Sequence, residues 1–236
     1  MDGEDKGAVS TDKLSILIDV IHVQQSFTWD CGLACAKMVV GTYSLDPDSV
    51  SKVCSKFDIR ESVWTIDLAF ILKEYGLKLA MFTVTLGVDQ TYANESFYTS
   101  NFNSDEGRVT RLFSEAADKG VHVEKRSMSI DEIISHLMTS GLVIVLIDWT
   151  HLSCIKCKEK WGILSPLSVF TSCLKSSYQG HYITLCGCDQ EEGIIYYRNP
   201  SYSNILCHCS YETLDKARQQ YGTDEDIIFI HPPTSS

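Results

Sequence analysis

The 236-residue sequence predicts an α+β fold, in which a helical part packs on an antiparallel sheet. Three observations favour this class: helical patterns come mainly first along the chain, strand patterns come mainly last, and no internal repeat is visible. Hydrophobic residues make up 44% of the chain and charged residues 22%, which is typical of a globular protein with a substantial core. We expect one domain over residues 14–232, preceded by a disordered acidic segment over residues 1–13.

The helices are predicted from apolar periodicity and from capping signals. An extended apolar run over residues 14–21 precedes Asp30, which is placed to cap a helix over about residues 31–43. Ser129 and Glu132 form a capping-box pattern before apolar residues spaced three and four apart, and this predicts one buried helix face. Further helices are expected over residues 46–57, 65–75, 104–119 and 210–221.

The strands are predicted from short apolar runs. Residues 142–147 form a continuous apolar run of strand length that ends at Asp148 and Trp149, which indicates a central strand. An acidic turn joins two further runs and predicts a hairpin over residues 182–197. Residues 77–86 and 227–230 are also expected to be strands.

Residues 151–178 show no clean period, and they predict a long surface insertion. This segment contains serines, a proline and three of the ten cysteines. Such an insertion could act as a lid over a cleft.

The charge balance excludes one class of partner and favours another. With 20 basic and 31 acidic side chains, the net charge is −11, so no broad basic surface is expected for nucleic acid. The acidic surface suits a basic protein partner. No apolar run reaches the roughly 20 residues of a membrane-spanning helix, and the N-terminus lacks a targeting pattern. We expect a cytoplasmic protein, with nuclear access open, whose cysteines are mostly reduced.

Cys31 is the first residue that predicts chemistry. A cysteine in the first turn of a helix has its thiolate stabilised by free backbone N–H groups and by the helix dipole, so a lowered pKa is expected. Gln25, six positions earlier, could place its amide N–H beside the sulfur, where a developing oxyanion would need a donor. Gly32 would allow a close approach to this site.

A nucleophile of this kind needs a base and a group that orients the base. His181 opens one strand of the predicted hairpin, and Asn199 follows the other strand. These two ends lie side by side in an antiparallel pair, so Asn199 could accept a hydrogen bond from the imidazole while His181 takes the proton of Cys31.

These residues are similar to those of papain-like cysteine peptidases, and especially of the bacterial double-glycine leader peptidases. The order Gln25, Cys31, His181, Asn199 matches the order in that family. The resemblance implies a papain-like fold with the cleft between the helical part and the sheet.

Nearly the whole chain also resembles the eukaryotic guanylyl-cyclase-like family. The stretches that carry this resemblance are residues 29–35 (WDCGLAC), 62–69 (SVWTIDLA), 85–89 (TLGVD), 178–181 (YQGH) and 221–227 (YGTDEDI). The resemblance implies conversion of GTP to cyclic GMP and pyrophosphate, with Mg²⁺ or Mn²⁺ as the metal. The residues themselves do not predict this activity, because the chain has neither a P-loop nor a Gly-x-Gly turn.

Only weak nucleotide-binding candidates are found. Lys160, Trp161 and Gly162 resemble the start of a loose pattern used to propose plant cyclase centres, but the later positions of that pattern do not match. Asp148 and Asp67 are the carboxylates nominated to hold a divalent cation.

A structural zinc site is a further hypothesis. Cys154 and Cys157 form a C-x-x-C pair, and Cys207, His208 and Cys209 follow downstream, so the chain holds enough thiolate and imidazole for a tetrahedral site. Reduced, unligated thiols are the alternative, and a disulfide is another.

Three functions therefore stay open at the level of sequence. The family resemblance implies a guanylyl cyclase acting on GTP. The residue chemistry predicts a cysteine-dependent peptidase, hydrolase or acyl transferase acting on a peptide or small-molecule substrate. A catalytically silent binding or scaffold protein is the third.

Overall fold

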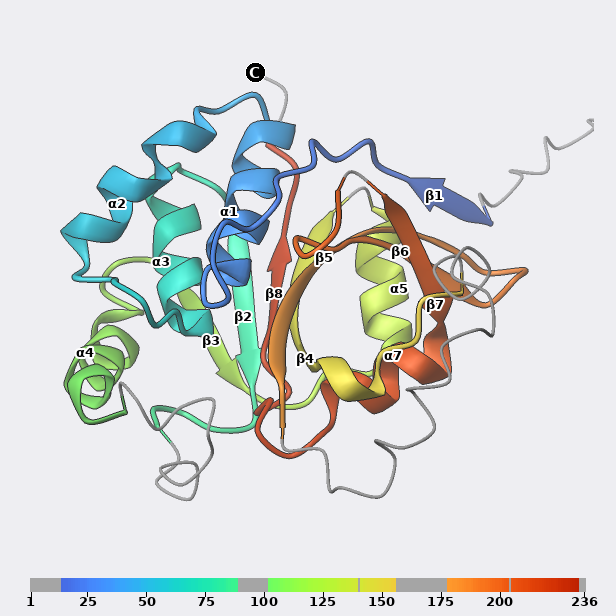
Figure 1. The fold of residues 1–236 in the computed structure, drawn as a ribbon. Coiled ribbons are helices and arrows are strands. Elements are labelled where there is room, and N and C mark those ends of the chain that lie inside the picture. The colour runs from blue at the N-terminus through green and yellow to red at the C-terminus, as the bar shows by residue number, and fades with distance from the viewer. Residues whose placement is uncertain (1–13, 89–101, 140, 156–177, 204, 234–236) are drawn as a thin grey trace, which may run out of the picture.

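The computed structural model describes residues 14–88, 102–139, 141–155, 178–203 and 205–233. One sheet forms the centre, with strand order β3-β2-β8-β4-β5-β6-β7 and with β1 paired to β5 away from this path. All described strand pairs are antiparallel except β2 with β3, which is parallel. The expected α+β class is confirmed (Figure 1).

The sheet is built from short strands, most of them in the second half of the chain. Their bounds are β1 Ser15–Leu17, β2 Leu79–Thr83, β3 His122–Lys125, β4 Leu142–Asp148, β5 Gly180–Asp189, β6 Ile194–Arg198, β7 Leu206–Ser210 and β8 Ile227–Ile230. Every residue of β4 is buried between β8 and β5, so the prediction of a central strand there is confirmed.

The helices begin and end close to the predicted positions. Their bounds are α1 Cys31–Thr42, α2 Val50–Lys56, α3 Thr65–Glu74, α4 Phe102–Glu115, α5 Ile130–Met138 and α7 Tyr211–Arg218, with short 3₁₀ turns at Pro47–Ser49 (η1) and Trp149–His151 (η3). The Ser129–Glu132 capping box is present, because each residue accepts the other's backbone N–H. The single helix predicted over residues 46–57 is instead η1 followed by α2.

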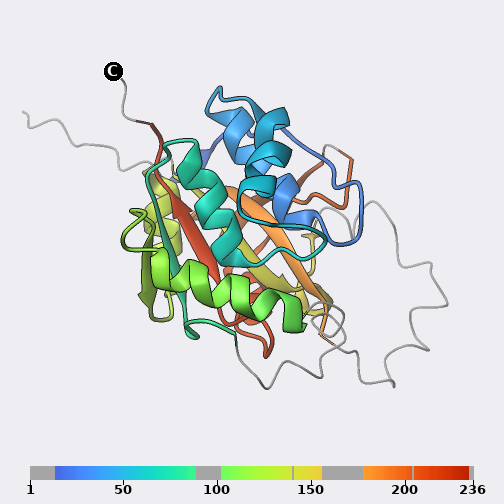
Figure 2. The same ribbon diagram turned by 90° about the vertical axis from the view of Figure 1, so that its left-hand side faces the viewer.

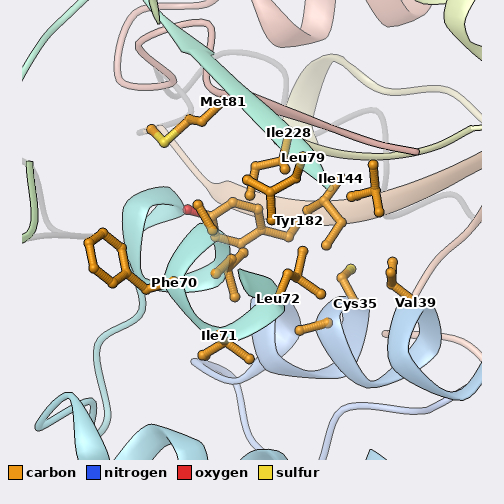
Figure 3. Close-up of a cluster of buried hydrophobic side chains, with 14 of the residues drawn as sticks. Cys35, Val39, Phe70, Ile71, Leu72, Leu79, Met81, Ile144, Tyr182 and Ile228 are labelled. Atoms are coloured by element: carbon orange, nitrogen blue, oxygen red, sulfur yellow. The ribbon is translucent and has the colours of Figure 1, made fainter. Parts of the chain in front are cut away.

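Two apolar cores lie on opposite faces of the sheet. The first joins α1, α2, α3 and α4 to one face, and Figure 2 shows this helical layer with α4 towards the viewer. Tyr182 of β5 inserts its ring into this core among side chains of α3 and the sheet (Figure 3). The second core packs α5 and α7 on the other face.

Two strands were not predicted, β3 and β7, and β3 forms the parallel pair at the sheet edge. The alternation of β7 places Cys207 and Cys209 inside and leaves His208 half-buried on the opposite face. Within the predicted surface insertion, Cys154 and Tyr178 are buried, so both ends of that segment contact the cores. Its middle, like residues 1–13, falls outside the described residues.

In the described parts of the chain, no helix is both long enough and apolar enough to cross a bilayer.

Candidate functional site

Cys31 is the first residue of α1, as the sequence predicted. Asp30 stands at the N-cap position, but its carboxylate makes no capping bond. It instead accepts the backbone N–H groups of Phe27 (2.9 Å) and Ser26 (3.1 Å), and so closes the loop before the helix. Asp30 is therefore the N-cap residue of α1, as predicted, but without a side-chain capping bond, so the first N–H groups of the helix remain free to face the sulfur.

Burial decides the protonation state of Cys31. The residue is 4% exposed, and desolvation raises the pKa of its thiol to about 11. Backbone N–H groups of Tyr182, Gly32 and Cys31 itself act in the opposite direction, because they stabilise the thiolate. The predicted lowering contributions exist, but the predicted net direction is wrong: the thiol is protonated near neutral pH in this structure.

The start of α1 lies against the start of β5. The Tyr182 N–H that faces the Cys31 sulfur belongs to the residue directly after His181. A Cβ at Gly32 would lie 3.0 Å from the Tyr182 ring and 3.1 Å from Leu68, so a larger residue would push these side chains back by a few tenths of an ångström. The Tyr182 hydroxyl shares a buried hydrogen bond of 2.8 Å with Thr65, which connects β5 to the first residue of α3.

His181 and Asn199 form the predicted hydrogen-bonded pair. The imidazole Nε2 lies 3.0 Å from the Asn199 Oδ1, which also accepts the Ser201 N–H at 2.9 Å. Because a carbonyl oxygen only accepts, Nε2 must carry the proton and Nδ1 is left as a lone-pair acceptor. Burial lowers the pKa of His181, although the bond to Asn199 opposes that shift. The imidazole is thus neutral and oriented, as a general base requires.

Among the described residues, no hydrogen bond joins the sulfur of Cys31 to the imidazole of His181. Neighbouring side chains on a strand alternate, so His181 leaves β5 on the face opposite the Tyr182 ring. The structure brings the helix start and the strand start together but holds the two groups as a neutral thiol and a neutral imidazole.

Two residues that were not assigned to the site surround the His181–Asn199 pair. The Trp149 ring stands edge-on to the imidazole, with centroids 4.8 Å apart and planes at 71°. His22 places Nε2 3.1 Å from the backbone oxygen of Asn199, so this histidine is tied to the segment after β6. The apolar Trp149 at the end of β4 was visible in the sequence, but nothing in the pattern indicated that it would cover an imidazole.

Gln25 lies at the same end of the sheet, held by the segment after Asn199. Its backbone N–H donates to Pro200 (2.9 Å), and its side-chain oxygen accepts from the Ser201 hydroxyl (2.9 Å). The amide nitrogen donates to the Phe27 carbonyl at 2.7 Å. One amide N–H is therefore occupied within the loop, and only the second stays available for the predicted oxyanion role.

The weak nucleotide and metal candidates receive little support from the described residues. Lys160, Trp161 and Gly162 fall outside them. Asp148 accepts hydrogen bonds from Thr150, and its second oxygen faces His151. Asp67 is fully buried, pairs with Arg108 and caps α3 through the Trp64 N–H.

The proposed zinc ligands converge only in part. Cys154, Cys207 and Cys209 are buried in the second core around Tyr197, whereas Cys157 lies outside the described residues. His208 faces away from the two cysteines of β7. Within the described parts of the chain, no group of three or more histidine, cysteine or carboxylate side chains could hold a metal ion.

Comparisons with known proteins match both resemblances. The family model described as guanylylate cyclase matches residues 20–230. A protein named guanylyl cyclase 1 from Arabidopsis thaliana is 36% identical over 219 residues, which cover 91% of this chain and 76% of that protein. The crystal structure of a C39-like peptidase from Bacillus anthracis aligns with a TM-score of 0.54 at 14% identity, covering 95% of this chain and 100% of that one. The fold is therefore papain-like.

Proposed function

Because the chain belongs to the guanylylate cyclase family, we propose that it converts GTP to cyclic GMP and pyrophosphate. The observation that carries this proposal is the extent of the family match, which runs from residue 20 to residue 230 and so includes every described helix and every described strand except β1. The Arabidopsis relative, whose name states this activity, covers 91% of the chain.

The reaction sets clear chemical demands. The 3′-oxygen of the ribose attacks the α-phosphorus, the bond from that phosphorus to the bridging oxygen breaks, and pyrophosphate leaves with the electron pair. The proton of the 3′-hydroxyl passes to a base or to water, and developing charge on the phosphates needs positive partners. The protein must therefore supply cationic side chains and hold the ribose close to the α-phosphate.

Mg²⁺ or Mn²⁺ is the cofactor that such chemistry implies. Of the two carboxylates nominated for it, Asp67 does not fit because it is paired with Arg108, and Asp148 keeps only one oxygen outside its hydrogen bonds to Thr150. No step of the reaction is assigned to a protein-held metal.

A second candidate function is carried by one geometric observation, the 3.0 Å bond that orients His181 on Asn199 beside a helix that begins with Cys31. In a cysteine-dependent hydrolase or acyl transferase, Nδ1 would take the thiol proton, and the sulfur would attack a carbonyl carbon. The leaving amine would receive that proton from the imidazole, and water or an acceptor nucleophile would release the acyl group from the thioester. The raised pKa of Cys31 opposes this step until the imidazole reaches the sulfur.

One set of variants separates the two functions. Purified protein with Mg²⁺ or Mn²⁺ is assayed for cyclic GMP from GTP by mass spectrometry and, in parallel, for cleavage of a peptide library. Cys31→Ala is expected to leave cyclic GMP formation largely intact, because a thiolate has no part in attack by the 3′-oxygen on phosphorus. Cys188→Ala, which removes another buried cysteine of β5, is the matched control.

Each outcome points to one function. Cyclic GMP formation that survives Cys31→Ala supports the cyclase, and its loss with Lys160→Ala or Asp148→Asn would also support the weak nucleotide candidates. Peptide cleavage that disappears with Cys31→Ala but not with Cys188→Ala would replace the cyclase by the hydrolase. Absence of both activities would favour a binding or scaffold protein on the same fold.

A further inference from the structure

Two cavities share a wall on the helical side of the molecule, at the connection between α2 and α3. The larger has a volume of about 690 Å³ and the smaller about 380 Å³, and Arg60 and Glu61 line both. Ligand pockets of roughly 300 to 1,000 Å³ are typical for small molecules of nucleotide size. Neither cavity includes Cys31, His181 or Asn199.

The larger cavity collects arginines in a chain whose net charge is −11. Arg60, Arg108 and Arg111 line it together with three carboxylates, those of Asp58, Glu61 and Asp105, and Asp105 is already paired with Arg108. Arg60 and Arg111 are exposed, and among the described residues neither guanidinium has an ion-pair partner. Guanidinium groups bind phosphate oxygens through two parallel N–H bonds, so two unpaired arginines on one cavity wall suit a polyphosphate.

Arg108 gives this cavity a fixed wall. It is 9% exposed, forms an ion pair with the buried Asp67, and donates to Asp105 at 3.0 Å. Its remaining contact is the carbonyl of Ser62, at 3.3 Å, on the loop that carries Arg60. The Trp64 indole N–H donates to the second oxygen of Asp105 at 3.1 Å. The first turns of α3 and α4 are therefore locked together behind the two unpaired arginines.

The smaller cavity has an aromatic wall instead. Phe27 and Trp29 stack with centroids 5.6 Å apart and planes at 6°, and Phe27 is 60% exposed. Leu33 and Ile59 contribute apolar surface to the same cavity. A stacked pair of rings, with Phe27 exposed and Trp29 half-buried, lies beside apolar side chains and offers a surface on which a nucleobase can stack.

We propose that these joined cavities bind a purine nucleoside triphosphate, with the base against Phe27 and Trp29 and the phosphates against Arg60 and Arg111. The inference rests on the proposed function and names the site where its substrate binds. Glu61 lies on the shared wall, where its carboxylate can accept the N1–H and the 2-amino group of guanine. Adenine offers no such pair of donors, so this residue would select guanine.

Equilibrium binding of GTP to the full chain tests the site, measured by isothermal titration calorimetry with Mg²⁺ present. The double variant Arg60→Ala/Arg111→Ala is expected to weaken GTP binding at least about tenfold, because several charge-assisted bonds to phosphate are lost, and to change guanosine binding little. Trp29→Ala is expected to weaken GTP and guanosine alike, since it removes stacking area. Glu61→Gln should reduce the preference for GTP over ATP.

Lys119→Ala is the matched control, because Lys119 is exposed and lines neither cavity. Circular dichroism and thermal melting verify that each variant is folded. Equal GTP affinities for the double arginine variant and the Lys119 variant would overturn the site. Loss of binding in Lys160→Ala, with the arginine variant unaffected, would overturn it as well and would place the nucleotide elsewhere.

The cyclase assay separates failure of this site from failure of the proposed function. Cyclic GMP formation that is unchanged in Arg60→Ala/Arg111→Ala overturns the site while the function stands. GTP binding that depends on the arginines, without any cyclic GMP formed, keeps the site and overturns the cyclase.

Discussion

Asp226 is a buried carboxyl group whose titration should control the stability of the fold. It lies directly before β8, 9% exposed, and its side chain hydrogen-bonds to Thr65 and Thr83. Burial raises the pKa of Asp226 to about 8, with a further increase from the negative charge of Asp224, while the two threonine hydroxyls lower it. The folded protein therefore holds this carboxyl in its neutral form at neutral pH.

The sign of the pH dependence follows from the proton count. Between the ordinary carboxyl pKa and about 8, the folded state keeps a proton that the unfolded state releases, so stability falls as pH rises. The slope for one proton is about 1.4 kcal/mol per pH unit, which amounts to roughly 3 kcal/mol between about pH 5 and about pH 7. Asp226→Asn keeps the shape of the side chain and its capacity for hydrogen bonds, but an amide does not titrate in this range. The contribution of residue 226 to the pH dependence of stability should therefore vanish in the variant.

Urea denaturation followed by tryptophan fluorescence measures the effect in both proteins across this pH range. The difference in unfolding free energy between Asp226→Asn and wild type should change by roughly 3 kcal/mol in favour of the variant as pH rises from about 5 to about 7. Asp67, whose pKa burial raises to about 6, contributes equally to both proteins and cancels. Asp118→Asn, at an exposed position, serves as the control. A difference that stays constant across the range refutes a neutral buried Asp226.

Two further predictions concern Cys31 and the attachment of β1. Because burial raises the pKa of Cys31 to about 11, this thiol should react slowly with iodoacetamide near neutral pH and faster as the pH rises. Peptide mass spectrometry measures the rate at each cysteine. Alkylation of Cys31 that is faster than at every other cysteine would contradict the burial argument. Gly187→Ala should lower the free energy of unfolding by roughly 1–3 kcal/mol, because the new Cβ would collide with the backbone of Ile16 and Leu17. The amides of β1 should then exchange their hydrogens faster. An unchanged melting temperature would contradict this packing.

Local patterns predicted most of the elements for physical reasons that are visible in the structure. The buried run of β4 and the capping box of α5 are signals carried by a few adjacent residues, and both are where they were expected. β3 was missed because its four residues are largely exposed, so no apolar alternation marks it. β7 is not apparent from the sequence because cysteines, rather than larger apolar side chains, supply its buried positions.

In the candidate site, too, some contacts follow from a local pattern and others do not. The pairing of His181 with Asn199 follows from hairpin topology, which places the first residues of β5 beside the end of β6, and the structure contains that bond. The edge-on contact of Trp149 with the imidazole comes from the turn directly after β4, and the register of β4 against β5 is not readable from either segment alone. The sequence therefore predicts site contacts that one turn or one hairpin determines, and it does not predict contacts that depend on the register between strands.

The pKa of Cys31 shows why local chemistry alone gave the wrong sign. Free N–H groups at the start of a helix lower a thiol pKa, and two such groups, with the Tyr182 N–H of β5 as a third donor, do act on Cys31. Their effect is exceeded because Gly32 lets the Tyr182 ring close over the helix start, and Tyr182 is in turn held by Thr65. The desolvation of Cys31 thus comes from Thr65 and Tyr182, which lie 34 and 151 positions further along the chain. Cys31 can therefore react only when this packing opens or when the imidazole of His181 accepts the thiol proton. The variant Thr65→Val removes the hydrogen bond to Tyr182 and should loosen the packing. Alkylation of Cys31 by iodoacetamide should then become faster, while alkylation of Cys188 should stay unchanged.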